Sequence, residues 1–321
     1  MIKKITLIIL SIIVVLIGVY VFLVCTKSQT DVYPDRKEGR LCDMPLSGSP
    51  LMVEIMPGLR FRIDSGSDMS VITERDLAKL DSLGYKAEKI TAITLGRNSN
   101  GDISFSTTRY KVDLPTYRYN FTKDSLGNVC AEIIPSSLNV IHNVEFMPAP
   151  TDLSVLGVDF MEVFNVEYRH ADQAISLSLD TLGNYESSIP IKYSRNPIDA
   201  IWLSKRYYLE AMVHDRPYDF FIDTGIRKAN MKLPTSEIVY SRSELENDTI
   251  ESFRGKYPAK MDKASWVAIG DRVGRRKVYY YDNDEEECAM NPFLFFKQDM
   301  LINYSDKMIK LRPFCDLGVR N

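Results

Sequence analysis

The stretches LRFRIDSGSDMSVIT (Leu59 to Thr73) and YDFFIDTGIRKANMKLP (Tyr218 to Pro234) follow one pattern. In each, an apolar strand ends in Ile-Asp and is followed by Ser or Thr and then by Gly. A shorter apolar run and a turn precede both, LMVEIM with Pro-Gly in the first case and YYLEAMV with Asp-Arg-Pro in the second. The two aspartates, Asp64 and Asp223, are 159 positions apart. An internal repeat of this size predicts two lobes built on one plan.

The ends of the two repeats are also alike. SVLGVDFMEVFNVEYRHADQAISL closes the first and NPFLFFKQDMLINYSDKMIKL closes the second, and each runs from an aromatic-rich segment through an apolar strand ending in Tyr to a last strand. We therefore place the first lobe at residues 45 to 180 and the second at 190 to 315. Short β-rich runs separated by turn residues predict an all-β fold. Short helices are expected over Glu74–Leu83 and Asp159–Phe164.

An aspartate at the end of an apolar strand, followed by a hydroxyl residue and a glycine, suits a catalytic loop. The strand delivers the carboxylate, the glycine allows a tight turn, and the hydroxyl can bond to a partner loop. Two such loops facing each other bring two carboxylates together, and these share one proton because both cannot ionise easily. One carboxyl group can then act as base and the other as acid on a water that attacks a peptide carbonyl.

At these residues the chain resembles the aspartic proteases, in particular their retroviral-type (retropepsin-like) branch. The resemblance implies a bilobal, pseudo-two-fold, pepsin-like fold, an endopeptidase activity on peptide or protein substrates, no cofactor or metal, and a monomer. Asp64 and Asp223 correspond to the catalytic aspartates. The supporting positions of the active loops correspond to Ser65, Gly66, Ser67, Thr224, Gly225, Leu156 and Gly157.

The second lobe departs from the family pattern in several places. Ile226 replaces a small residue, Arg227 and Lys228 follow it, and NPFLFF offers no glycine to match Gly157. The alternative is therefore a catalytically inactive, peptide-binding or scaffold protein of the same fold at the membrane surface. A further alternative is an enzyme built from two copies of the first lobe, as in homodimeric relatives. Residues 90 to 114 are the candidate for a flap over the cleft, with 98 to 101 as its tip.

The amino-terminal run of residues 5 to 25 is apolar and uncharged. It is long enough to cross a hydrocarbon core of about 30 Å, so it predicts a transmembrane anchor in residues 1 to 25. Lys3 and Lys4 precede it, which predicts a cytoplasmic amino terminus and an extracytoplasmic catalytic domain. A cleaved signal peptide and a lipoprotein acylated at Cys25 are the alternatives. Residues 26 to 44 are polar and read as a tether.

Composition excludes several other functions. Lys plus Arg is 40 against 43 Asp plus Glu, so the basic excess of a nucleic-acid binder is missing. The histidines match no zinc-peptidase pattern, and neither a nucleophile elbow nor a phosphate loop occurs. The cysteines beyond the anchor, at positions 42, 130, 288 and 315, are compatible with disulfides in three pairings or with buried free thiols.

Overall fold

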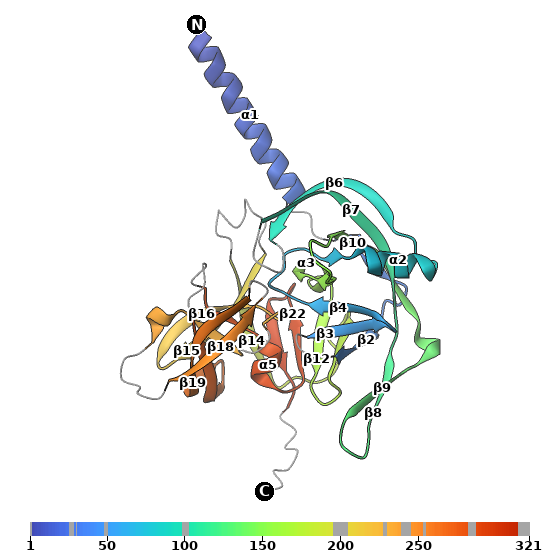
Figure 1. Ribbon diagram of the computed structural model, residues 1–321, viewed down its shortest axis with the longest axis vertical. Helices are drawn as coiled ribbons and strands as arrows, with labels where there is room; N and C mark the ends of the chain where they lie inside the picture. Colours follow the sequence, from blue (N-terminus) through green and yellow to red (C-terminus); the bar gives the residue numbers. More distant parts are fainter. Residues whose placement is uncertain are drawn as a thin grey trace.

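The structure is a computed structural model. It describes residues 2–25, 29, 31–47, 51–97, 103–194, 205–226, 230–238, 245–252, 255–281 and 287–313. Most of these residues lie in β-strands, which form a broad body with short helices at its surface and interior (Figure 1). The predicted β class of the body is therefore correct.

One antiparallel sheet connects the amino-terminal and carboxy-terminal parts of the chain. Its central pair, β12 and β22, joins residues far apart in sequence, with Val166 opposite Ile302. The remaining strands flank this pair symmetrically, two on each side. The order across the sheet is β2 (Arg40–Ser47), β13 (Ala174–Ser178), β12 (Asn165–Arg169), β22 (Met300–Asn303), β23 (Met308–Leu311) and β14 (Ser187–Ser194).

The first unit is built on one side of this sheet. Its strands are β3 (Met52–Met56), β4 (Leu59–Ile63), β5 (Val71–Ile72), β6 (Glu88–Arg97), β7 (Ile103–Thr116), β10 (Asn139–Pro148) and β11 (Val155–Leu156). Strand β11 pairs in parallel with β4 and antiparallel with β5, so it lies directly behind the loop that follows β4. The hairpin of β8 (Tyr119–Lys123) and β9 (Val129–Ile133) and the short β1 (Tyr33–Pro34) complete this unit.

The second unit repeats the pairings among the seven main strands of the first. Its strands are β15 (Arg206–Val213), β16 (Arg216–Ile222), β17 (Met231–Leu233), β18 (Glu246–Ser252), β19 (Gly255–Ile269), β20 (Arg272–Tyr280) and β21 (Ala289–Met290). As in the first unit, the short strand β21 pairs in parallel with the aspartate-bearing strand, β16, and antiparallel with β17. The duplicated pattern in the sequence thus corresponds to a duplicated network of strand pairs.

The helices of the body are short. Helix α2 (Glu74–Ser82) begins after Thr73, whose hydroxyl accepts a hydrogen bond from the Asp76 N–H at 3.1 Å, as an N-cap does. Helix α3 (Val158–Met161) follows β11, and helix α5 (Pro292–Phe296) follows β21. Single 3₁₀ turns cover Pro135–Ser137 and Thr235–Glu237.

Helix α1 (Ile2–Cys25) projects from the β body (Figure 1). Among the residues that the structure describes, no helix is long and apolar enough to cross a bilayer. The predicted transmembrane anchor is therefore wrong, and so is the single-pass membrane location derived from it.

The segment expected to be a polar tether is partly built into the sheets. Strand β1 pairs with β10, and β2 forms one edge of the connecting sheet. Gln29 is buried, and its side chain donates a hydrogen bond to Asp159 Oδ2 at 2.7 Å. These contacts attach residues 29 to 47 to the first unit along much of their length.

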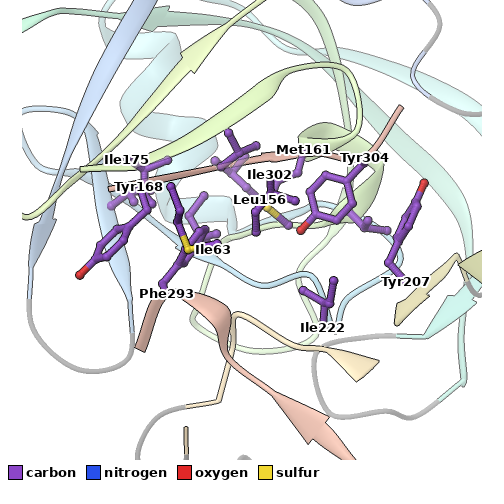
Figure 2. Packing of buried hydrophobic residues seen from close by; sticks show 14 of the residues in the cluster. Ile63, Leu156, Met161, Tyr168, Ile175, Tyr207, Ile222, Phe293, Ile302 and Tyr304 are labelled. Carbon is purple, nitrogen blue, oxygen red and sulfur yellow. The ribbon is translucent and has the colours of Figure 1, made fainter. Parts of the chain in front are cut away.

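The hydrophobic core extends to the base of the two aspartate loops. Ile63 and Ile222, the residues directly before the aspartates, are fully buried and lie with Leu156, Ile302 and Tyr304 (Figure 2). Each such side chain contributes about 1.5 to 3 kcal/mol by leaving water. The strand ends that carry Asp64 and Asp223 are therefore fixed by packing.

Candidate active site

Both aspartates lie at the ends of strands that are held by the pairing strand behind them. Asp64 follows β4, and its N–H donates to the Leu156 carbonyl at 3.1 Å. Asp223 follows β16, and its N–H donates to the Met290 carbonyl at 2.9 Å. Asp64 is buried and Asp223 is half-buried. The two loops thus leave their strands in equivalent ways.

The hydroxyl residues after the aspartates bond across from one loop to the other. The Ser65 N–H donates to Thr224 Oγ1 at 2.9 Å, and the Thr224 N–H donates to Ser65 Oγ at 3.1 Å. Each hydroxyl then donates onward to a carbonyl of the opposite strand, Ser65 to Ile222 at 2.7 Å and Thr224 to Ile63 at 3.3 Å. Four buried hydrogen bonds therefore fix the two loops against each other.

The glycines leave room for the carboxylates between the loops. Asp64 Oδ1 accepts from the Gly66 N–H at 3.0 Å, and Asp223 Oδ1 accepts from the Gly225 N–H at 2.9 Å. A Cβ on Gly66 would lie 3.0 Å from both of these Oδ1 atoms, so they are separated by no more than twice that distance. A Cβ on Gly225 would lie 2.5 Å from Asp64 Cγ. Both aspartates meet within one chain. A homodimer that pairs two copies of the first lobe is therefore not needed to bring two aspartates together.

The first loop is supported from behind by the segment that contains Leu156 and Gly157. The Val158 N–H donates to the Ser67 carbonyl at 2.9 Å, and Ser67 Oγ donates to the Met69 carbonyl at 2.8 Å. A Cβ on Gly157 would lie 2.7 Å from the backbone carbon of Met69. Glycine is required at this position because the two backbones approach so closely.

Ser70 and Asp159 also support the first loop, and no sequence pattern linked these two residues. Ser70 Oγ accepts a hydrogen bond from the Gly157 N–H at 3.0 Å and donates to Asp159 Oδ1 at 2.7 Å. Asp159 is fully buried, and burial raises its pKa. The spacing of Ser70 six residues after Asp64 gave no local sign of this contact, which depends on the parallel pairing of β11 with β4.

In the second unit, Asn291 takes the place of Gly157. The registers of β11 and β21 align Leu156 with Met290, so the expected glycine position falls on Asn291. Its side-chain amide donates to the carbonyls of Thr224 at 2.8 Å and Ile226 at 3.2 Å. In the second unit, hydrogen bonds from the Asn291 side chain to the aspartate loop thus replace the close backbone contact that Gly157 makes in the first unit. The signal in the sequence was Asn before Pro at the start of a helix, which is typical of an N-cap.

Arg62 is a site residue that sequence reasoning missed. It is 3% exposed, and its Nη2 lies 3.3 Å from Asp64 Oδ2. The same nitrogen donates to the Gly225 carbonyl of the other loop. The available signal was its position two residues before Asp64, which places both side chains on one face of the strand.

Asp223 is shifted toward its protonated form. Burial is the main cause and the charge of Asp64 adds to it, so that the pKa of Asp223 rises to about 6 although Lys232 and Arg62 oppose the change. Lys232 projects from β17 and holds its ammonium 5.4 Å from the centre of the Tyr281 ring. Two cations, one from each unit, therefore act electrostatically on Asp223.

Several expectations concern residues outside the described part of the chain. These are Arg227 and Lys228 after the second loop, the flap tip at 98 to 101, and Cys315. The described part of the flap candidate is the hairpin of β6 and β7. Cys42, Cys130 and Cys288 are free thiols, as the second interpretation of the cysteines expects, but of the three only Cys42 is buried, and Cys130 is exposed.

No protein-family model and no curated protein matches the sequence. Among solved structures, the crystal structure of basic 7S globulin from soybean is similar, with a TM-score of 0.40 and 10% sequence identity over 88% of this chain and 94% of that one. None of these comparisons supports the retroviral-type branch in particular.

Proposed function

We propose that the chain is an aspartic-type endopeptidase in which Asp64 and Asp223 activate one water molecule. The observation that carries this proposal is the reciprocal bonding of Ser65 and Thr224, with the Oδ1 atoms of both aspartates beside Gly66. Two loops of equivalent design, fixed in this way, hold two carboxyl groups at one point. That is the arrangement that general acid–base catalysis on water requires.

The proposed reaction assigns different roles to the two groups. The Asp64 carboxylate takes a proton from the water, and the water oxygen attacks the carbonyl carbon of the peptide bond. Asp223, protonated below about pH 6, donates a hydrogen bond to the carbonyl oxygen and stabilises the negative charge that forms there. The C–N bond then breaks, a proton passes to the leaving nitrogen, and a carboxylic acid and an amine are released.

The proposed substrate is an extended peptide segment. An extended chain presents backbone N–H and C=O groups along its edges and side chains to alternating faces. The hairpin of β6 and β7, which is joined to β10 next to the first loop, is the proposed partner for those backbone groups. Specificity for particular side chains would then come from pockets on either side of the aspartates.

Cleavage of a peptide library by the purified chain, followed by mass spectrometry between pH 3 and pH 8, tests the proposal. Asp64→Asn and Asp223→Asn should each lower cleavage at least about 1,000-fold, because either change removes the acid–base pair. Asp219→Asn is the matched control, since this half-exposed carboxylate lies on β16, the strand that leads to Asp223, and pairs with Lys192. Circular dichroism should show all three variants folded. Cleavage retained by Asp64→Asn would refute the proposal.

A second candidate function is peptide binding without cleavage. It is favoured by Arg62, which pairs with Asp64 and so competes with a water for that carboxylate. In this case the unmodified chain would bind library peptides, release them unchanged at every pH, and keep its affinity in Asp64→Asn. Mass analysis of bound peptides separates the two functions.

A further inference from the structure

The unusual feature of the site is a buried arginine beside the aspartate pair. A buried guanidinium is costly unless its charge is compensated and its N–H groups are bonded. The charge of Arg62 is compensated by the Asp64 carboxylate in its own loop, and its Nη2 donates to the Gly225 carbonyl in the other. Arg62 thus contacts one atom of each loop and links the two loops.

The geometry around Gly225 shows how closely this contact is fitted. The position that a Cβ would take at Gly225 is already filled by Arg62 Nη2 and by the Asp64 carboxyl group. Any side chain at residue 225 would therefore displace the guanidinium. The second unit offers no equivalent arginine, because the strand registers align Arg62 with Phe221.

A different cation serves the second unit. The registers of β5 and β17 align Lys232 with Val71, so a lysine stands where the first unit has an apolar residue. The ammonium faces Tyr281 and is electrostatically coupled to Asp223 and Glu287. Glu287 is itself paired with Arg206.

The groups that act on Asp223 come from several elements. Those with charge or a titrating proton are Asp64 and Arg62 at the end of β4, Lys232 in β17 and Tyr304 after β22. Of these, only Arg62 and Lys232 are cations. Removing either one leaves the negative charge of the pair less compensated.

We infer that Arg62 is a positioning residue of the aspartate pair, and that with Lys232 it sets the upper pH limit at which the pair holds a single proton. The inference rests on the proposed function for its meaning, although the proton itself can be followed without catalysis. A nearby cation favours the ionised carboxyl group, so it lowers the pH at which Asp223 releases its proton. Loss of the cation should extend the singly protonated form to higher pH.

Three variants and a control test this inference. Arg62→Gln removes the charge and keeps an amide that can donate to the Gly225 carbonyl, Arg62→Lys keeps a charge, and Lys232→Met removes the second cation. Arg60→Met is the matched control, because this arginine lies on the same strand, is 57% exposed at its side chain and pairs with Glu54. The first readout is the upper midpoint of the pH profile of kcat/KM. The second is the carboxyl carbon of Asp223, followed by NMR in the peptide-free chain with labelled aspartate and assigned through Asp223→Asn.

We expect the midpoint, near pH 6 in the unmodified chain, to rise by at least about one pH unit in Arg62→Gln and in Lys232→Met. Arg62→Lys should stay closer to the unmodified chain, and Arg60→Met should not differ from it. An unchanged Asp223 titration in folded Arg62→Gln would overturn the inference, and so would a shift of equal size in Arg60→Met. If Arg62→Gln does not fold, an unchanged midpoint in Lys232→Met overturns the joint role. Absence of cleavage by the unmodified chain would refute the proposed function, while the NMR titration would still decide the role of Arg62.

Discussion

Ser65 and Thr224 each accept a hydrogen bond on the side-chain oxygen from the backbone N–H of the other. The two residues belong to different units, yet neither loop can satisfy its buried N–H group alone. The loops therefore stabilise each other, and the geometry of the aspartates depends on both. This mutual dependence can be measured.

A double-mutant cycle of Ser65→Ala and Thr224→Val should reveal strong coupling. Each single change leaves a buried N–H and a carbonyl without a partner, which costs about 1 to 3 kcal/mol of unfolding free energy. The double variant should lose clearly less than the sum, because the first change already lets the two loops separate and so weakens the hydrogen bonds that the second change removes. Urea unfolding measures all four proteins, and Ser82→Ala, at an exposed position of helix α2, is the control. Strict additivity would contradict a shared network.

Gly157→Ala should destabilise the chain by at least about 2 kcal/mol. The added methyl group would press against the backbone of Met69 at 2.7 Å, and a backbone cannot rotate away as a side chain can. Gly274→Ala is a suitable control, since its methyl group would meet only the mobile end of Arg276 at 3.1 Å. Thermal unfolding of both variants gives the comparison. Equal changes in Tm would argue against the close approach.

Asp223→Asn should become more stable relative to the unmodified chain as the pH rises. The pKa of Asp223 is raised from 3.8 to about 6 in the folded state, chiefly by burial. The folded chain therefore holds this proton more tightly than the unfolded chain, and its stability falls between about pH 4 and pH 6. Asparagine does not titrate, so the variant should gain on the order of 3 kcal/mol between pH 3.5 and pH 7.5 relative to the unmodified chain. Urea unfolding at both pH values measures the gain, and a difference that stays constant with pH would disprove the shift.

The thiols should react at very different rates. Cys42 is fully buried, and burial raises its pKa to about 12, whereas Cys130 is exposed. Alkylation requires an accessible thiolate, so iodoacetamide at pH 8 should modify Cys130 at least about 100-fold faster than Cys42. Peptide mapping by mass spectrometry assigns each site, and labelling in urea should make the two rates similar. Rapid labelling of Cys42 in the folded chain would place it at the surface.

The sequence was informative where a structural feature depends on neighbouring residues alone. Asp64 and Asp223, with the hydroxyl and glycine that follow each, form one short pattern whose chemistry can be understood without a structure. Thr73 likewise marked the start of helix α2, since an N-cap acts within its own turn. The membrane prediction failed because hydropathy of residues 5 to 25 was its only basis, and no described helix meets the requirement for spanning.

Other site residues could be assigned only from contacts between distant segments. In the sequence, Arg62 is an ordinary strand residue. Asn291 stands where the repeat of the first unit would place a glycine equivalent to Gly157. Their roles became visible through the pairing of β4 with β11 and of β16 with β21. Lys232 is a similar case, because its alignment with Val71 follows from strand registers and not from any local motif.

The amino-acid sequence alone determined that two acidic loops of one design end two apolar strands, because side-chain type and spacing specify each loop locally. The tertiary structure decided which charges surround the aspartates and which backbone groups hold them. These contacts depend on strand registers and core packing between segments more than 150 residues apart. Registers and packing are set by hydrogen bonds and buried surfaces that no single segment contains.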